Sequence, residues 1–197
     1  MSTDIDRSFI ATLQHDGSPI NVFDTMTTGP VILESPNQAP AFTLDGARAL
    51  GLLDGNEADW QHGRDFGLIT FDKGPAPAPL MLYFRYSQAG YRLYVRSGRH
   101  LGEGVFCDAY GVVNSQPIEA LDPASWHVTL AQNGEPFDLT ETEGDSHDIQ
   151  LTNPHGHPLQ VHGLYPVGGY LTCHSAARKS TLRLIILARN IDWLNAD

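Results

Sequence analysis

Apolar and polar residues alternate in short runs along most of the chain, and one arrangement of these runs recurs. In the stretch "GHPLQVHGLYPVGGYLTCHS", residues 156–175, a Pro precedes an alternating run, a Gly-Gly turn follows, and a second alternating run ends in Ser. Strands with one buried face show this period of two. The same order of features occurs at 17–35 and 78–97. The three stretches therefore predict three copies of a strand–turn–strand unit.

Further strand-like segments flank each copy. Each Pro follows one, at 9–14, 66–71 and 148–152. Each Ser precedes another, at 41–45, 104–110 and 182–187. The pattern predicts four short strands in each of three units, which cover roughly 8–52, 66–115 and 126–197 of one all-β domain that spans 1–197.

Two kinds of segment do not fit the three copies. Residues 126–141 read as an inserted hairpin, because Asn133-Gly134 is a strong signal for a two-residue turn. This segment also resembles 9–23, which keeps open a β-sandwich built by duplication. Residues 46–65 and 114–125 read as connections, the first with one or two helical turns before an acidic loop.

Twelve strands in three four-stranded units are the pattern of a β-trefoil. The stretch "GGYLTCHS", residues 168–175, resembles the G-x-Y-L third strand of fascin-like and ricin-type trefoil lectins. This resemblance implies a trefoil-like barrel and a lectin-like role. The Gln-x-Trp signature of the ricin-type repeats is absent from the chain, so no sugar-binding residue is carried over from that family.

Net charge, the first residues and the cysteines indicate which partners and which cellular compartment to expect. The net charge of −11 argues against a nucleic-acid partner, because phosphate neutralisation needs a basic surface. The first residues, "MSTDIDRSF", lack the profile of a secretory signal, so we expect cytoplasmic synthesis, with release by a non-classical route left open. The two cysteines, Cys107 and Cys173, read as buried thiols, and a single disulfide between them stays open.

Histidines are the first candidates for chemistry. Five of the nine lie within 147–174, but "NPHGHP" is a turn by composition and no Cys-x-x-Cys or His-Glu-x-x-His motif accompanies them. We therefore expect exposed histidines, no catalytic residue and no cofactor. A metal-dependent enzyme is the weaker alternative, and its candidate ligands are His155, His157, His162 and His174.

Arginines and tyrosines supply a second candidate surface. The window 85–102 contains no acidic residue, although the chain has 23. Strand alternation predicts that Leu93 and Val95 face inward and that Arg92, Tyr94 and Arg96 face outward. The guanidinium group of arginine binds anionic groups, and tyrosine rings contact sugars. The alternative is that these are ordinary charged positions on the outer face of a sheet, paired with acidic residues of the next strand.

These observations predict a non-catalytic, lectin-like recognition module whose partner is a glycan or a small anionic ligand. The alternative is a membrane-acting toxin or a protein that binds lipid head groups, with a membrane surface as its partner. The predicted ligand-binding residues share polar or aromatic side chains on the strands of the second and third units. They are Tyr83, Arg92, Tyr94, Arg96, His162, Tyr165, Tyr170 and Arg178.

Overall fold

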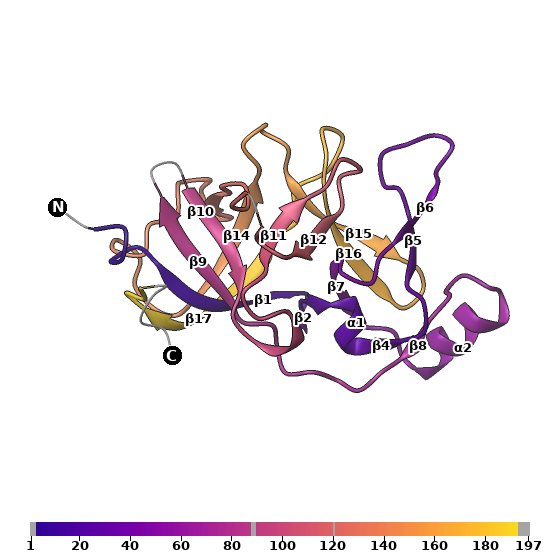
Figure 1. Ribbon diagram of the computed structural model, residues 1–197. Coiled ribbons are helices and arrows are strands. Elements are labelled where there is room, and N and C mark those ends of the chain that lie inside the picture. Colours follow the sequence, from indigo (N-terminus) through magenta and orange to yellow (C-terminus); the bar gives the residue numbers. More distant parts are fainter. Residues whose placement is uncertain (1–2, 88–89, 120, 193–197) are drawn as a thin grey trace.

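The computed structural model describes residues 3–87, 90–119 and 121–192, and most of its regular structure is antiparallel β-sheet (Figure 1). The all-β class is therefore confirmed. The largest sheet has nine strands, namely β1 (Phe9–His15), β2 (Ser18–Pro19), β9 (Leu82–Ser87), β10 (Gly90–Val95), β11 (Gly104–Cys107), β12 (Val113–Gln116), β13 (His127–Leu130), β14 (Ser146–Thr152) and β17 (Leu182–Arg189). The second sheet has four, namely β3 (Asn21–Val22), β7 (Leu50–Leu53), β15 (Leu159–Leu164) and β16 (Gly168–Cys173).

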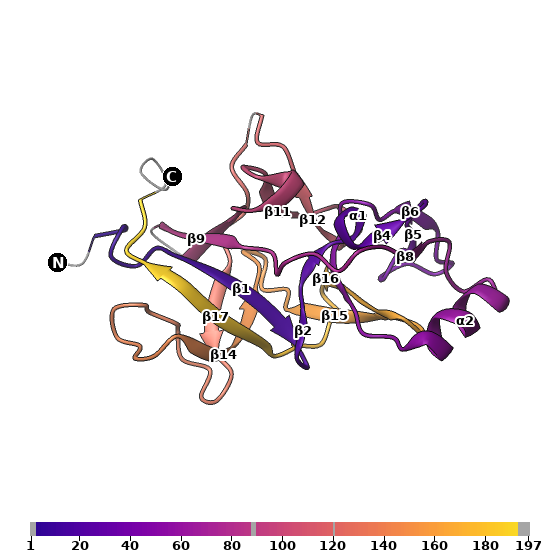
Figure 2. The same cartoon turned by 90° about the horizontal axis from the view of Figure 1, so that it is seen from below.

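The nine-stranded sheet has the order β12-β11-β10-β9-β1-β17-β14-β13, with β2 paired to β1. The first long strand thus pairs with the last, and Figure 2 shows β1 and β17 side by side. Within the described residues no sheet closes on itself into a barrel, since the edge strands β12 and β13 do not pair with each other. A single bridge between Tyr91 and Trp126 connects β10 to the segment that leads into β13.

Smaller elements lie at the right of Figure 1, beside the four-stranded sheet. Two two-stranded ribbons form there, β4 (Thr27–Thr28) with β8 (Asp72–Lys73) and β5 (Ile32–Glu34) with β6 (Thr43–Asp45). The helices are α1 (Phe23–Met26), α2 (Glu57–Asp65) and a 3-10 turn at Gly98–His100. In the described part of the chain no helix is both long and apolar enough to span a bilayer.

The main core lies between the nine-stranded and four-stranded sheets. Its side chains come from alternate positions along the strands. Phe9 stacks on Phe84 across the β1–β9 pair, with ring centroids 4.7 Å apart. Leu93 and Val95 also belong to this core, as strand alternation predicted, and Leu171 and Cys173 of β16 join them. A second, smaller apolar cluster, built around Phe23 and Trp60, supports α1, α2 and the ribbons.

The predicted strand at 66–71 is wrong. This segment follows α2 without forming a strand, because Phe66 caps the helix and Gly67 takes a left-handed φ of 63°. The acidic stretch predicted as a loop instead starts that helix. Asn56 and Asp59 form a capping box there, and acidic residues are stabilising at a helix N-terminus.

Backbone pairing confirms a hairpin within 126–141, although its turn has four residues, 131–134, rather than two. Leu130 N–H donates to the Glu135 carbonyl at 2.9 Å, and Phe137 N–H donates to the Val128 carbonyl at 2.9 Å. Gly134 sits at the turn with a φ of 74°, a conformation that glycine adopts at little cost. Only the first arm, β13, is a regular strand.

Candidate functional site

Four connecting loops converge at one end of the molecule, the upper edge of Figure 1. They join β5 to β6, β11 to β12, β14 to β15, and β16 to β17. Residues of all four loops line one cavity of about 400 Å³, which we call the loop-end cavity. Because binding residues are often found on loops held by a rigid scaffold, this cavity is a candidate binding site.

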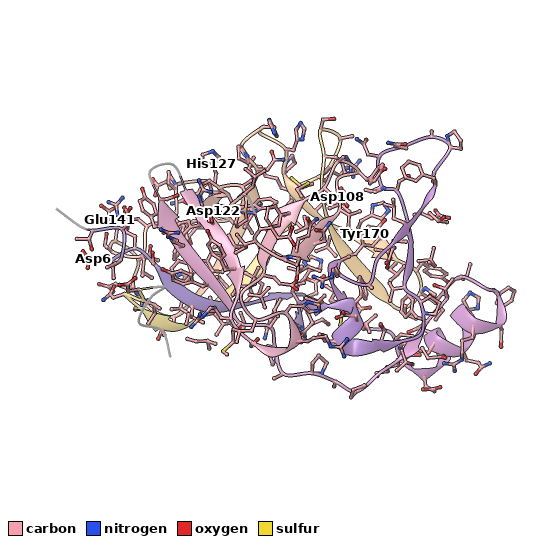
Figure 3. The ribbon with its side chains drawn as sticks, in the orientation of Figure 1. Asp6, Asp108, Asp122, His127, Glu141 and Tyr170 are labelled. Atoms are coloured by element: carbon pink, nitrogen blue, oxygen red, sulfur yellow. The ribbon has the colours of Figure 1, made fainter. Side chains whose placement is uncertain are left out.

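Asp108 fixes the loop between β11 and β12 and lies toward this end of the molecule (Figure 3). Its Oδ1 accepts hydrogen bonds from the backbone N–H of Tyr110 and of Val112, each 2.9 Å long, and its Oδ2 accepts one from Asn114 Nδ2 at 3.1 Å. Gly111 completes the turn with a φ of 84°. The Asp108 carboxylate is thus occupied by the loop itself, and its role is to position the residues around it.

Tyr110 is the exposed aromatic side chain that this turn presents to the cavity. Its residue surface is 42 % exposed, and its ring meets Phe42 of the β5–β6 loop edge to face, with centroids 4.9 Å apart. Tyrosine in such a place offers an apolar ring and a hydroxyl to a ligand. The contact with Phe42 holds the ring in place before any ligand arrives.

Asn153 organises the β14–β15 loop in a similar way. Its Oδ1 accepts hydrogen bonds from the backbone N–H of His155 at 3.0 Å and of His157 at 2.9 Å. The two imidazoles have centroids 6.1 Å apart, and both residues line the cavity. His155 is exposed and His157 is half-buried.

His174 belongs to the cavity lining and is 8 % exposed, yet neither ring nitrogen has a hydrogen-bond partner among the described residues. Burial lowers its pKa below the usual 6.5, and the neighbouring imidazoles of His162 and His157 lower it further. His174 is therefore neutral at pH 7, with one N–H donor and one nitrogen acceptor. The indole N–H of Trp126, in the same lining, also lacks a partner.

Both cysteines of the chain lie in the same lining and carry free thiols. Cys107 Sγ is 3.2 Å from the carbonyl oxygen of Cys173, and Cys173 Sγ is 3.2 Å from the carbonyl oxygen of His157. The prediction of two buried thiols is confirmed for Cys173, whereas Cys107 is half-buried, and no disulfide joins them.

Three tyrosines of the predicted surface are buried. Tyr94 lies on the face of β10 opposite Leu93 and Val95, as predicted, but that face is covered rather than exposed. Tyr83 donates to the Ile191 carbonyl at 3.0 Å, Tyr94 to Asp122 Oδ1 at 3.1 Å, and Tyr170 to the Glu34 carbonyl at 2.8 Å. The reason is that other segments cover these strands on their outer side. In Figure 3, Asp122 lies well to the left of Asp108 and Tyr170.

The remaining predicted residues do not gather at one place. Arg92 is half-buried and donates to the Pro123 carbonyl at 3.1 Å, and Arg96 is also half-buried. His162 packs on Tyr170 with centroids 5.1 Å apart, which joins two predicted residues. Tyr165 and Arg178 are exposed, and Tyr165 contacts His62 rather than another predicted residue.

The four histidines considered as metal ligands are not arranged as a metal site. Over the described ranges, no group of three or more His, Cys, Asp or Glu side chains is placed to hold a metal ion. His155, His157 and His174 do share the cavity lining, whereas His162 lies beside it on β15.

Sequence reasoning missed Tyr110, Asp108 and Trp126 as cavity residues. One local signal was present, because "DAYG" at 108–111 places Asp and Gly around two residues, which is typical of a turn. Comparison of the chain with protein-family models, curated proteins and solved structures gives no match. The function proposed next therefore rests on the cavity and its residues.

Proposed function

We propose that the protein is a non-catalytic recognition module that binds a neutral saccharide in the loop-end cavity. The observation that carries this proposal is Tyr110, an exposed aromatic ring held against Phe42 at the edge of a cavity lined by polar side chains. A sugar ring has an apolar C–H face and hydroxyl groups around its edge. An aromatic ring beside neutral donors and acceptors complements both features.

The size of the cavity suits a small ligand. Its volume of about 400 Å³ falls in the range of roughly 300–1,000 Å³ that is common for small-molecule sites. The supporting loops are fixed by the hydrogen bonds of Asp108 and Asn153. A site that is ordered before binding loses less conformational entropy on binding, which raises affinity.

The polar residues of the lining are suited to hydroxyl groups. Asn37, His155 and Ser175 are exposed members of it, and His157 is half-buried. An amide offers a donor and an acceptor, as a hydroxyl group does, and imidazole nitrogens also form hydrogen bonds with hydroxyl groups. Such groups pair with a saccharide without requiring charge on either side.

Charge favours a neutral ligand over the small anionic ligand that the sequence left open. The described residues of the lining include no lysine or arginine, and the carboxylate of Asp108 is occupied by its own loop. The whole chain carries a net charge of −11, which repels anions at long range.

A glycan array that carries both neutral and sulfated sugars tests the proposal. We expect binding to one class of neutral saccharide and none to the sulfated forms. Absence of binding to every glycan by folded protein would remove the saccharide proposal, and binding restricted to sulfated sugars would contradict the charge argument.

We also propose that the three units are arranged as in a β-trefoil. Support comes from two bridges, Ala49 with Asn114 and Val112 with Thr172, which join one segment from each predicted unit. The pairing of β1 with β17 also brings the first and last units together. Superposition of the three units in an experimental structure tests this, and backbones that do not superpose would contradict it.

One observation favours the second candidate function, binding to a membrane surface. Phe66 and Tyr165 are each 70 % exposed, and both rings contact His62, with centroids 4.6 Å and 5.9 Å away. Exposed aromatic groups of this kind are enriched where proteins meet a lipid interface. Flotation with phosphatidylcholine vesicles tests it. We expect co-flotation that Phe66→Ala/Tyr165→Ala abolishes, and wild-type protein that stays at the bottom of the gradient would rule the function out.

A further inference from the structure

The two cysteine side chains are brought together from strands that are far apart in the sequence. Cys107 ends β11 and Cys173 ends β16. The Cys173 N–H donates to the Gly111 carbonyl at 2.7 Å, and Val112 bridges Thr172. These backbone interactions hold the two segments together without any bond between the sulfur atoms.

The Cys107 thiol lies directly against residue 173. Cys107 Sγ is 3.2 Å from the Cys173 carbonyl oxygen, and Cys173 Sγ is 3.2 Å from the carbonyl oxygen of His157. Both residues line the loop-end cavity, where Cys107 is half-buried and Cys173 is buried. Both cysteine residues are therefore adjacent to a small solute that enters the cavity.

The two thiols differ in acidity. The hydrogen bond with Cys173 raises the pKa of Cys107, and burial and Asp108 raise it further. The hydrogen bond from Cys107 lowers the pKa of Cys173, although burial opposes this effect. Cys173 is therefore the sulfur that loses its proton first, and a thiolate is the nucleophile in reactions with oxidants.

A buried polar group adjoins this pair. Both nitrogens of His174, the residue next to Cys173, lack partners among the described residues. Because no group of three metal-ligating side chains is found in the described ranges, the pair does not read as part of a metal centre. Two neighbouring free thiols have another common chemistry, which is oxidation to a disulfide.

We propose that Cys107 and Cys173 are an oxidation site at which hydrogen peroxide, or another small peroxide, forms an intramolecular disulfide. The Cys173 thiolate attacks one peroxide oxygen, the O–O bond breaks, and Cys173 becomes a sulfenic acid while hydroxide leaves and takes up a proton as water. The Cys107 sulfur then attacks the Cys173 sulfur. The S–S bond forms, the S–O bond breaks, and a second water leaves with the Cys107 proton. The two thiols lose two electrons, and one peroxide is reduced to two waters.

The disulfide would join β11 to β16 across the lining of the loop-end cavity. The site goes beyond saccharide binding and does not depend on it, because the reaction needs only the two sulfur atoms and the peroxide. A thiol reductant would restore the original lining, so the modification is reversible.

The test uses the reduced full chain and hydrogen peroxide. After treatment the chain is unfolded, any remaining thiol is blocked with N-ethylmaleimide, and the intact mass is measured. We expect a mass lower by two hydrogen atoms, loss of both titratable thiols, and recovery of both after dithiothreitol. Peptide mapping should find residues 107 and 173 in one cross-linked pair.

Two matched variants test the order of the steps. Cys107→Ser should accumulate a sulfenic acid on Cys173 that dimedone traps, because no second thiol is available to displace it. Cys173→Ser should leave Cys107 as an unmodified thiol over the same time. Circular dichroism shows whether each variant is folded, and the wild-type mass measurement stands without them.

Three results would overturn the proposal. The first is wild-type protein that keeps both thiols after treatment with peroxide. The second is separate oxidation of each thiol to a sulfinic acid with no cross-link. The third is a disulfide found only between two molecules, seen as a dimer on a non-reducing gel.

Discussion

Nε2 of His100 lies 2.8 Å from Oδ1 of Asp24, although the two residues are 76 positions apart in the sequence. His100 is 3 % exposed, and its other ring nitrogen lies 3.0 Å from Oε2 of Glu103. Glu103 also accepts hydrogen bonds from Arg48 and from the hydroxyl of Ser115. This polar network connects α1, the 3-10 turn and β12.

Replacing His100 with Ala should destabilise the fold strongly. The change leaves two partly buried carboxylates, Asp24 and Glu103, without their shared hydrogen-bond partner, and leaving a buried polar group unsatisfied costs about 1–3 kcal/mol. Urea unfolding measures the loss. His155→Ala is the matched control, because His155 is exposed and its change should stay within about 0.5 kcal/mol. Equal stability of the two variants would contradict this account of the network.

Glu103 should make the fold sensitive to acid. Burial raises the pKa of Glu103, but hydrogen bonds from Ser115, Arg48 and His100 outweigh it and lower the pKa below the usual 4.5. A lowered pKa in the folded state means that the ionised carboxylate stabilises the fold above about pH 4.5 and that this contribution is lost as pH falls further.

Unfolding curves of wild type and Glu103→Gln from pH 7 to pH 3 measure that contribution. We expect the stability difference between them to be largest above pH 4.5 and to shrink below it, because the wild-type carboxylate is then protonated as well. A difference that stays constant over the whole range would show that the carboxylate charge contributes nothing.

Gly168→Ala should destabilise the hairpin of β15 and β16. A Cβ at Gly168 would collide with the backbone oxygen of Leu52 on the paired strand β7, and backbone atoms cannot move aside cheaply. Overpacking of this kind costs about 1–3 kcal/mol. Gly163→Ala, in the same hairpin, is the control, because a Cβ there meets nothing within 4 Å. Thermal unfolding of both variants should separate them, and equal midpoints would refute the steric argument.

Tyr94→Phe should lower stability without changing ligand binding. The hydroxyl of Tyr94 donates to Asp122 in a covered position, and loss of one such hydrogen bond costs about 1 kcal/mol. Tyr165→Phe, at an exposed position, should change neither property. If Tyr94→Phe weakened saccharide binding while leaving stability intact, the ligand would contact this strand after all.

The strands were the part of the fold that the sequence predicted best. Segments 9–14, 148–152 and 182–187 all lie in strands of the nine-stranded sheet, because alternation at period two directly reflects one buried face. The segment 66–71 has the same alternation and forms no strand. Phe66, the first residue of the segment, caps the C-terminus of α2, and the Ile69 side chain lies next to Gly63 of that helix.

The candidate site could be predicted only in part. Alternation identified the outward face of β10 but could not show that Asp122 and Pro123 cover it through Tyr94 and Arg92. The loop-end cavity combines four loops that are distant in the sequence, and only their packing brings Tyr110 and His155 into one lining. Composition marked the β14–β15 loop as a turn, whereas the strand predicted at 104–110 ends at Cys107 and the turn of Asp108 and Gly111 follows it.

The most direct test of saccharide binding compares wild type with Tyr110→Ala on the same glycan array, with Tyr165→Ala as the matched control. Both tyrosines are exposed, but only Tyr110 lines the loop-end cavity. We expect wild type and Tyr165→Ala to bind the same neutral saccharides and Tyr110→Ala to lose at least about tenfold in affinity, which corresponds to about 1.4 kcal/mol. Binding that survives in Tyr110→Ala but fails in Tyr165→Ala would place the ligand elsewhere and contradict the proposed site.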